Sequence, residues 1–441
     1  MQKLKTWKET LDFMYQRLPM YQRIGAAAYK KDLTNTILLC EACDNPHLQL
    51  KCIHIAGTNG KGTTTHIIAS GLQSQSFSVG VYTSPHYIDF RERIKINGVY
   101  ISKKYIRDFI NAHLHEIDKI QPSFFELTVA LAFRYFADMK VDFAVIETGL
   151  GGRLDSTNVI TPLISVITNI SYDHQSMLGN TLPLIAAEKA GIIKEAIPVV
   201  IGESQDEVSD VFYKKAEELH APIQYADQHL SLNQKAGFKG ELVYDVYNDG
   251  KLWLKDLKTD LIGPFQSKNI ITGLYALKAL STHIPLDFDK VVEGFTEIHK
   301  KTGYMGRWQI LDKGPLILAD SAHNVGGMDL ITKELKMIKD GKLHIILGFV
   351  NDKDISDILA MMPKNAQYYF AKANIPRGLD AALLQRQSET YGLKGQPYIS
   401  VRKAFAAARR HAALEDTIFI GGSIFVVGEV LEKYLKKSLK S

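Results

Sequence analysis

Residues 52–65 read Cys-Ile-His-Ile-Ala-Gly-Thr-Asn-Gly-Lys-Gly-Thr-Thr-Thr, a short apolar run followed by a glycine-rich segment with one lysine. The pattern predicts a buried strand, a loop and the start of a helix. Gly57, Gly60 and Gly62 allow backbone N–H groups to approach an anion closely. Lys61 adds a positive charge, and the helix N-terminus adds a partial one. We therefore interpret this segment as a phosphate-binding loop.

The loop differs from the common nucleotide-binding pattern G-x-x-x-x-G-K-[ST]. That pattern needs a glycine five positions before Gly60, where this chain has Ile55. It also needs serine or threonine directly after Lys61, where this chain has Gly62, so the first hydroxyl is that of Thr63. We expect this difference to indicate which phosphate chemistry the protein performs.

Further apolar, β-branched runs follow within the first 200 residues, and helix-length amphipathic segments separate them. This alternation indicates parallel βαβ units, so we predict an α/β fold with a doubly wound, mostly parallel sheet that carries the phosphate-binding loop. Ligands of such sheets bind at the carboxyl ends of the strands, so residues just after each run are candidates for a site. The predicted strands are 53–56, 79–82, 143–147, 164–169 and 198–201.

The pattern changes near residue 240. Alternating apolar residues on both sides of Asn248-Asp249-Gly250 predict a β-hairpin over 241–254, and a helix is expected from Asn269 to Leu280. The basic segment His299 to Gly303 marks a boundary, which gives domains of residues 1–300 and 301–441. The second domain is predicted to be a smaller, Rossmann-like α/β domain with strands at 316–319, 344–347, 368–371 and 417–420.

The amino-acid composition limits which kinds of binding partner we expect. The chain has 441 residues, enough for more than one core, and a net charge of +5 from 53 basic and 48 acidic residues. Basic residues form no stripe with interleaved aromatics, so we expect no nucleic-acid partner. No apolar run is long enough to cross a membrane, and the N-terminus lacks an apolar signal core, so we predict a cytoplasmic protein without a membrane partner.

Several candidate residues follow predicted strands or end helices. Glu147 ends one strand, and a Mg²⁺ ion between phosphates needs only a few oxygen ligands, so Glu147 could hold it with the hydroxyls of Thr63 and Ser84. Taken alone, a glutamate that ends a strand is usually a capping or surface residue, and the neighbouring phosphate-binding loop is what favours the metal role for Glu147. A lone histidine such as His174 is more often a hydrogen-bonded packing residue, and a second cation nearby would favour metal binding instead. Lys189 is interpreted as a lysine in the last turn of a helix, and nothing in the local spacing argues otherwise.

Other candidates also have structural explanations. Ser123-Phe124-Phe125-Glu126 has the spacing of a helix capping box, which accounts for it fully. Asp320 to Asn324 follow a predicted strand, where a capped turn and a binding site are equally supported. Arg307 could reach a polyphosphate, although a solvated arginine is the default interpretation.

Together these stretches resemble the folylpolyglutamate synthase and dihydrofolate synthase family of the Mur ligase group. The resemblance covers about residues 50 to 430. Its motifs, in order, are Gly57-Thr-Asn-Gly-Lys-Gly-Thr63, Thr83-Ser-Pro-His86 with Glu92-Arg-Ile94, Glu147-Thr-Gly-Leu-Gly-Gly-Arg-Leu-Asp-Ser-Thr-Asn158, Asp173-His174 before Leu178-Gly179, Glu188-Lys-Ala-Gly-Ile192, Asp320-Ser-Ala-His-Asn324 and Gly422-Ser423.

The resemblance implies functional roles for residues in and near these motifs. The implied ATP-binding residues are Asn59, Gly60, Lys61, Gly62, Thr63, Asn269, Arg307 and Asp320. The implied ligands of two Mg²⁺ ions are Thr63, Ser84, Glu147, His174 and a carbamylated Lys189. The implied folate-binding residues are Ser123, Phe124, Phe125, Glu126, Leu154, Asp155 and Ser156, and the implied glutamate-binding residues are His323 and Ser423.

The resemblance also implies the reaction. ATP phosphorylates a carboxylate of dihydropteroate or a reduced folate, and the amino group of L-glutamate attacks the resulting acyl phosphate. Lys61, Asp320 and His323 are the implied catalytic residues, and a monomer is expected. Whether the enzyme uses one acceptor or both stays open.

Two alternatives are weighed against this interpretation. A Mur-type cell-wall amino acid ligase usually carries an extra domain before its loop and has Thr or Ser directly after the lysine, whereas here only 56 residues precede Gly57 and Gly62 intervenes. A nucleotide switch without ligase chemistry needs an N-K-x-D stretch that reads guanine. Residues 351–354 only approximate that stretch because the lysine is displaced.

Overall fold

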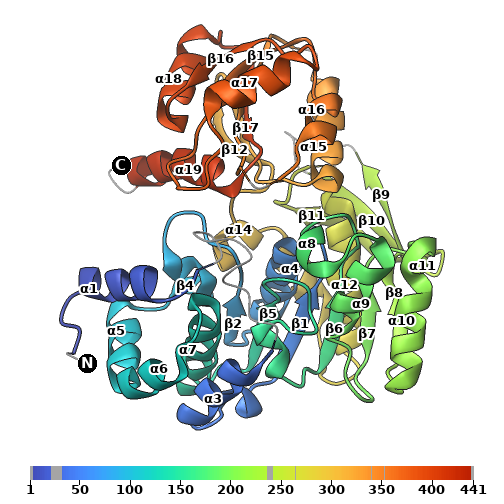
Figure 1. Cartoon of the computed structure of the whole chain (residues 1–441). Coiled ribbons are helices and arrows are strands. Elements are labelled where there is room, and N and C mark those ends of the chain that lie inside the picture. The colour runs from blue at the N-terminus through green and yellow to red at the C-terminus, as the bar shows by residue number, and fades with distance from the viewer. Residues whose placement is uncertain are drawn as a thin grey trace. The chain divides into compact units, whose positions relative to one another are not determined.

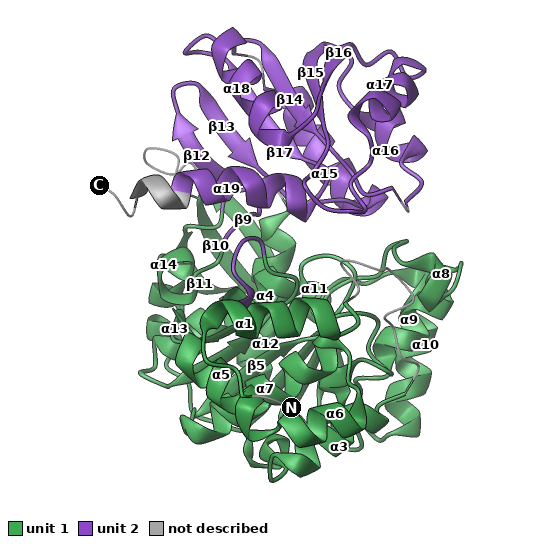
Figure 2. Ribbon diagram, turned by 60° about the vertical axis from the view of Figure 1, so that its left-hand side comes forward, with its two compact units in different colours: residues 1–86, 91–261, 265–304 green, residues 87–90, 262–264, 305–441 purple. Residues whose placement is uncertain are grey.

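The computed structural model describes residues 3–20, 32–235, 242–263, 265–338, 340–351 and 353–438. Asp352, in the stretch compared with guanine-reading sequences, lies outside these residues. The chain forms two compact units (Figures 1 and 2): unit 1 comprises residues 1–86, 91–261 and 265–304, and unit 2 comprises residues 87–90, 262–264 and 305–441. Within the described ranges no helix combines the length and the apolar character that a membrane crossing requires.

Unit 1 contains a large sheet. Its strands are β1 Cys52–Ala56, β2 Val79–Tyr82, β3 Ile94–Ile96, β4 Val99–Tyr100, β5 Phe143–Glu147, β6 Ile164–Ile167, β7 Val199–Ile201 and β8 Ile223–Tyr225. They form an eight-stranded sheet in the order β4-β3-β2-β5-β1-β6-β7-β8. The neighbours from β2 to β8 are parallel, whereas β3, near one edge, pairs antiparallel with both β2 and β4. The predicted α/β fold with a mostly parallel sheet is confirmed.

Helices and short helical turns accompany this sheet (Figure 1). They are α1 Trp7–Asp12, η1 Phe13–Arg17, α3 Thr34–Ala42, η3 Pro46–Gln49, α4 Lys61–Gln73, η4 Phe90–Arg93, α5 Lys103–Ala112, α6 Leu114–Ile120, α7 Phe124–Asp138, η5 Ser156–Val159, α8 Gln175–Leu178, α9 Leu182–Ala190, α10 Asp206–Glu218, α11 Ala226–His229, α12 Gln266–Leu280, α13 Phe288–Phe295 and α14 Ile298–Thr302.

Side chains of the parallel strands alternate between two buried faces of the sheet. Ile55 and Val166 belong to a core shared with α4 and α12, whereas Ala56 and Ile167 belong to a core shared with α9 and α10. Because both faces are covered, these strands are continuous apolar runs, as the sequence predicts for a parallel sheet.

Glycines bring α4 and α12 close together. A Cβ atom added to Gly71 would lie 2.7 Å from Cδ1 of Leu277, and one added to Gly273 would lie 2.5 Å from Cγ2 of Ile67. Such distances are far below ordinary van der Waals contact, so at each point the glycine backbone of one helix packs directly against a side chain of the other. This packing fixes the start of α12 beside the start of α4.

A three-stranded antiparallel sheet completes unit 1, in the order β11-β10-β9. Its strands are β9 Leu230–Lys235, β10 Leu242–Asn248 and β11 Lys251–Thr259. Asn248 pairs with Lys251 across Asp249 and Gly250, whose φ angles are 48° and 76°. Two residues with positive φ form the tight turn that matches the twist of a hairpin. The predicted hairpin is confirmed.

Unit 2 is a second α/β structure. Its strands are β12 Gln309–Lys313, β13 Leu316–Ala319, β14 Leu343–Leu347, β15 Ala366–Ala371, β16 Gly395–Tyr398 and β17 Thr417–Gly421, and its helices are α15 Val325–Met337, α16 Ser356–Met361, α17 Ala381–Glu389, α18 Val401–His411 and α19 Ile424–Ser438. The sheet order is β12-β13-β17-β14-β15-β16, and only β12 is antiparallel to its neighbour. The four predicted strands correspond to β13, β14, β15 and β17, whereas the edge strands β12 and β16 were not predicted.

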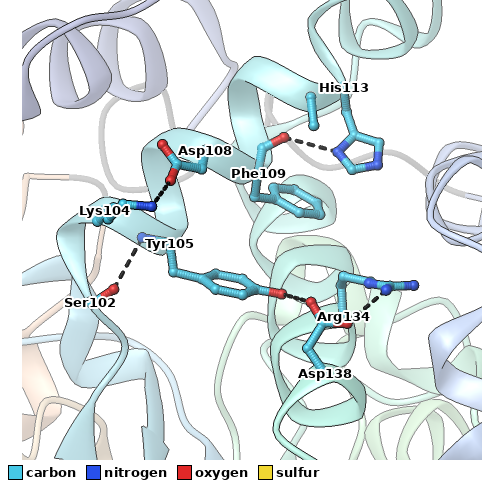
Figure 3. A pocket seen from close by; sticks show the side chains of 9 residues that line it. Ser102, Lys104, Tyr105, Asp108, Phe109, His113, Arg134 and Asp138 are labelled. Atoms are coloured by element: carbon cyan, nitrogen blue, oxygen red, sulfur yellow. Dashed lines mark hydrogen bonds and ion pairs between the residues drawn. The ribbon is translucent and has the colours of Figure 1, made fainter.

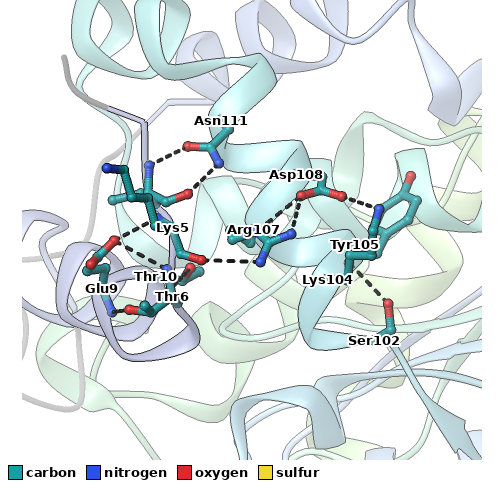
Figure 4. Close-up of polar contacts among 11 residues, drawn as sticks. Lys5, Thr6, Glu9, Thr10, Ser102, Lys104, Tyr105, Arg107, Asp108 and Asn111 are labelled. Carbon is teal, nitrogen blue, oxygen red and sulfur yellow. Dashed lines mark hydrogen bonds and ion pairs between the residues drawn. The ribbon is translucent and has the colours of Figure 1, made fainter.

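The N-terminal segment packs against α5 (Figure 4). Leu4 N donates to Oδ1 of Asn111 at 2.8 Å, and Nδ2 of Asn111 donates back to Leu4 O at 2.9 Å. Arg107 Nη1 donates to Lys5 O at 3.3 Å. These bonds satisfy backbone groups before α1 begins and hold the segment on the helix.

Candidate functional site

The phosphate-binding loop, residues 57–63, lies between the end of β1 and the first turn of α4. It is held by residues that follow β6: Thr168 Oγ1 donates to Asn59 O at 2.6 Å, and Asn59 N donates to Asn169 Oδ1 at 3.1 Å. A Cβ atom on Gly57, whose φ is 144°, would lie 1.9 Å from Thr168 Oγ1. Only glycine therefore fits at the start of the loop. The sequence placed Thr168 and Asn169 in a strand and missed this role.

Two lysines converge on the carbonyl oxygen of Gly57. Lys61 Nζ donates to it at 3.0 Å and to Thr58 O at 3.1 Å, and Lys189 Nζ donates to it at 2.7 Å. Lys189 reaches the loop from the last turn of α9 and is only 4% exposed. Burial, with a smaller contribution from the charge of Lys61, lowers the pKa of Lys189 to about 7. The structure thus places Lys189 against the loop.

Glu147 at the end of β5 lies beside the start of α4. Ser84 N donates to Glu147 Oε2 at 3.0 Å, which orients the buried carboxylate. A Cβ atom on Gly62 would lie 3.6 Å from both carboxylate oxygens, an ordinary contact distance. The structure thus brings Gly62, Ser84 and Glu147 together. It also shows that space alone does not require glycine at position 62.

Thr63 contacts a residue that the sequence analysis did not identify. Its Oγ1 lies 2.7 Å from the hydroxyl of Tyr304, and both residues are buried. Gln266 Nε2 donates to the same tyrosine hydroxyl at 3.4 Å, and Asn269 Nδ2 donates to Gln266 Oε1 at 2.9 Å. A Cβ atom on Gly60 would lie 2.2 Å from Asn269 Oδ1, so Asn269 touches the loop directly.

His174 is the residue before α8 and has a left-handed backbone, with φ 49°. Its Nε2 lies 3.8 Å from Oδ1 of Asp173, whose carboxylate also accepts the N–H of His174 at 2.9 Å. In the described part of the chain, no three histidine, cysteine, aspartate or glutamate side chains form a metal-binding group. The predicted metal residues are instead two hydroxyls, a carboxylate, an imidazole and a lysine.

The predicted folate residues 123–126 form the capping box that the sequence indicates. Glu126 N donates to Ser123 Oγ at 3.2 Å, and Ser123 N donates to Glu126 Oε2 at 2.6 Å. The Phe124 ring is stacked 5.8 Å from the Tyr15 ring, whereas Phe125 packs so closely on Gly149 that a Cβ there would lie 2.4 Å from the ring.

The other predicted folate residues, 154–156, include a buried aspartate. Asp155 Oδ2 accepts the N–H groups of Gly149 and Leu150, both at 2.8 Å, and Oδ1 accepts from Thr157 N at 3.0 Å and Thr157 Oγ1 at 2.6 Å. Burial raises the pKa of Asp155, and these hydrogen bonds oppose the rise. Asp155 therefore organises the glycine-containing loop after β5.

In unit 2, the predicted residues follow two adjacent parallel strands. Asp320 follows β13, is buried, and accepts from Trp308 N and Ala322 N, both at 2.7 Å. Burial raises the pKa of Asp320, while the charge of Arg307 opposes the rise. Ser423 lies two residues beyond β17, and its Oγ accepts the N–H of Phe425 at 3.2 Å. Because β13 pairs with β17, Asp320 and Ser423 lie at the same edge of the sheet.

His323 lies in the turn between β13 and α15. Its Nδ1 lies 3.0 Å from the carbonyl oxygen of Ser321, and Ser321 Oγ lies 2.7 Å from the hydroxyl of Tyr87. Asn324 caps α15 by accepting the N–H of Gly327 at 2.8 Å. The capped turn, one of the two alternatives that the sequence leaves open for this segment, is therefore present, and it orients His323.

A hollow of about 330 Å³ lies on α5 and the end of α7 (Figure 3), and no predicted site residue lines it. Its charged side chains pair with one another: Lys104 with Asp108 at 2.7 Å, and Arg134 with Asp138 at 2.6 Å. The Tyr105 hydroxyl donates to Asp138 at 2.5 Å. Since these groups satisfy one another, we assign no ligand to this hollow.

Comparison with protein-family models gives two matches. The model of the Mur ligase middle domain matches residues 55–277, which include the phosphate-binding loop, Glu147 and Lys189. The model of the Mur ligase glutamate ligase domain matches residues 306–424, which include Asp320 and Ser423.

Similar proteins cover nearly the whole chain. The dihydrofolate synthase/folylpolyglutamate synthase of Bacillus subtilis is 36% identical over 401 residues, which are 88% of this chain and 91% of the relative. The folylpolyglutamate synthase of Lacticaseibacillus casei is 32% identical over 415 residues, 92% of this chain and 94% of the relative.

Two solved structures of similar enzymes resemble this chain over most of its length. Escherichia coli FolC in complex with DHPP and ADP has a TM-score of 0.86 at 26% identity, with 100% of both chains covered. A bifunctional folylpolyglutamate synthase/dihydrofolate synthase with Mn, AMPPNP and L-glutamate bound has a TM-score of 0.80 at 27% identity, with 92% of this chain and 94% of that chain covered.

Proposed function

Because this chain belongs to the folylpolyglutamate synthase and dihydrofolate synthase family of Mur ligases, we propose that it joins L-glutamate to dihydropteroate, to reduced folates or to both, with conversion of ATP to ADP and phosphate. The observation that carries the proposal is the grouping of Lys61, Thr63, Ser84 and Glu147 around the first turn of α4. This grouping supplies a cation, hydroxyls and a carboxylate where a polyphosphate would meet the helix N-terminus.

The reaction has two steps. A carboxylate oxygen of the acceptor takes the γ-phosphoryl group of ATP, which releases ADP and leaves an acyl phosphate. The amino group of L-glutamate then attacks the acyl carbon, phosphate leaves, and the amine loses a proton as the amide forms. Both ATP and the acceptor are anionic, so the Lys61 ammonium and the N–H groups at the start of α4 would stabilise the charge of the transferring group.

The residues around Glu147 fit a Mg²⁺ ion. Thr63 and Ser84 offer hydroxyl oxygens, and the Ser84 N–H holds the Glu147 carboxylate in place. Hard oxygen donors of this kind suit Mg²⁺, which keeps several waters and needs few protein ligands. Held by Thr63, Ser84 and Glu147, the ion would supply positive charge that stabilises the phosphoryl group during its transfer.

A second ion would use His174 and a carbamylated Lys189. Carbamylation joins Nζ to the carbon of CO₂ with loss of one amine proton, so it needs an unprotonated amine. The pKa of about 7 for Lys189 supplies that form near neutral pH. With ¹³C-labelled bicarbonate, a carbamate signal in ¹³C NMR is expected for the wild type and not for Lys189→Met. The same signal in both proteins would contradict the modification.

Other residues take the roles that the family implies. Asn59, Gly60, Gly62, Asn269, Arg307 and Asp320 would contact ATP. Ser123, Phe124, Phe125, Glu126, Leu154, Asp155 and Ser156 would line the acceptor site, and His323 and Ser423 would bind L-glutamate. For Asp155 and Glu126, the hydrogen bonds within the protein support an indirect role, in which they shape the loop and the helix start.

The cell-wall ligase alternative has less support. The relatives at 36% and 32% identity are folate enzymes over about nine-tenths of this chain's length, 88% and 92%. We further propose a monomer in the cytoplasm, without nucleic-acid or membrane partners. Light scattering of the purified protein checks the monomer.

The deciding experiment measures glutamate-dependent ADP formation with dihydropteroate and with tetrahydrofolate, each alone. Activity with dihydropteroate identifies a dihydrofolate synthase, activity with tetrahydrofolate identifies a folylpolyglutamate synthase, and activity with both identifies a bifunctional enzyme. A folded protein with no activity toward either acceptor would overturn the proposal.

A further inference from the structure

Tyr304 joins several elements at the phosphate-binding loop. It follows α14, is 6% exposed, and its hydroxyl lies 2.7 Å from Thr63 Oγ1 in the first turn of α4. The hydroxyl also accepts from Gln266 Nε2 at 3.4 Å, and the Gln266 amide is held by Asn269. Nothing in the motif of residues 57–63 indicates this partner.

The ring of Tyr304 is held on several sides. The His66 ring lies 5.2 Å away and the His299 ring 5.1 Å away, both measured between centroids. Burial lowers the pKa of His66 well below its ordinary value, so this neighbour is neutral near neutral pH. Lys95 Nζ donates to Gly303 O at 3.2 Å and fixes the backbone just before the tyrosine. The hydroxyl of Tyr304 therefore has a defined position.

A hydroxyl that ligates a metal must direct a lone pair at it. A threonine hydroxyl has one proton and two lone pairs, and its proton rotates unless a partner accepts it. A fixed acceptor beside Thr63 would take this proton and leave the lone pairs for a cation. The oxygen of Tyr304 lies at a distance that suits this bond.

We propose that Tyr304 is a positioning residue, whose hydroxyl accepts the proton of Thr63 and turns the lone pairs of Thr63 toward the metal bound with ATP. This inference rests on the proposed function, which makes Thr63 a metal ligand. In this proposal Tyr304 acts on the ion only through Thr63. Removal of the Tyr304 hydroxyl should reduce the gain in nucleotide affinity that the metal provides. The nucleotide affinity measured without metal should stay unchanged.

The test compares Tyr304→Phe with the wild type. Phenylalanine keeps the ring packing and removes only the hydroxyl. Isothermal titration measures AMPPNP affinity in Mg²⁺ and in EDTA. The gain in affinity caused by Mg²⁺ should fall about fivefold in the variant, the effect of one lost hydrogen bond, while affinity in EDTA should stay within about twofold. Tyr244→Phe is the matched control, because Tyr244 is a buried tyrosine of the same core on the three-stranded sheet, and it should match the wild type.

Three results would overturn the inference. AMPPNP affinities of Tyr304→Phe that match the wild type both in Mg²⁺ and in EDTA show that the hydroxyl is not needed to position Thr63. Equal weakening in Mg²⁺ and in EDTA assigns Tyr304 a packing role. A wild-type protein whose AMPPNP affinity does not respond to Mg²⁺ overturns the proposed metal site as well, so failure of the proposed function is distinguishable from failure at Tyr304 alone.

Discussion

At the scale of single residues, Lys189 shows how burial changes chemistry. Its amine lies against Gly57 O beside Lys61, and its pKa falls from 10.5 to about 7. A lysine with a lowered folded-state pKa penalises the folded state where the amine is charged. Between about pH 7 and 10.5 the unfolded chain binds more protons than the folded one, so this group makes stability rise with pH.

We predict that raising the pH increases the unfolding free energy of the wild type relative to Lys189→Met. Urea unfolding at about pH 7 and about pH 9, in bicarbonate-free buffer, should show a relative gain of up to about 1.4 kcal/mol per pH unit. Lys268→Met, which removes a lysine side chain that is 54% exposed, is the control. Parallel pH dependence of the wild type and Lys189→Met would contradict the lowered pKa.

At the scale of elements, the glycine contacts between α4 and α12 make a prediction about packing. Gly71→Ala would push a methyl group against Leu277, and we expect a loss of about 1–2 kcal/mol in unfolding free energy. In a Leu277→Ala background the clash disappears, so the same substitution should be neutral or stabilise by up to about 1 kcal/mol through helix propensity. Urea unfolding of the wild type, Gly71→Ala, Leu277→Ala and the double variant gives the coupling energy between the two positions. Effects that add within about 0.5 kcal/mol would contradict the contact.

Strands with two buried faces were predictable from sequence. Val79–Tyr82 and Phe143–Glu147 have the predicted bounds because every side chain in them is buried, so the apolar run ends where the strand ends. The edge strand Gln309–Lys313 is half exposed and polar, and Gly395–Tyr398 contains a proline, so neither has the pattern of a buried strand. Sequence patterns detect burial more readily than they detect pairing.

The same distinction holds for the site. The loop glycines and Lys61 are a local pattern, and their adjacency to Glu147 follows from parallel strands that end at one edge of the sheet. The partners Thr168 and Tyr304 contact the loop from more than 100 residues away in sequence. No local spacing encodes such contacts, and only the packed structure supplies them.

At the scale of the whole molecule, each unit has its own parallel sheet with polar residues at the carboxyl edge. In unit 1 this edge carries the phosphate-binding loop and Glu147, and in unit 2 it carries Asp320 and Ser423. The two family models also divide the chain near residue 300. The middle domain matches residues 55–277, and the glutamate ligase domain matches residues 306–424. The residues proposed for L-glutamate, His323 and Ser423, belong to unit 2, whereas the phosphate-binding loop belongs to unit 1.

This separation predicts distinct footprints in hydrogen exchange. AMPPNP with Mg²⁺ should slow exchange in peptides that cover 57–65, because ligand contacts reduce local opening of the loop. Peptides that cover 320–325 include Asp320, proposed to contact ATP, so AMPPNP should already slow their exchange. L-Glutamate added afterwards should slow exchange in peptides that cover 421–425, where Ser423 lies, and further in those that contain His323. D-Glutamate is the control for nonspecific effects of a dicarboxylate and should change neither footprint. If L-glutamate protected only unit 1 peptides, the amino acid site proposed for unit 2 would be wrong, while the nucleotide site would stand on its own footprint.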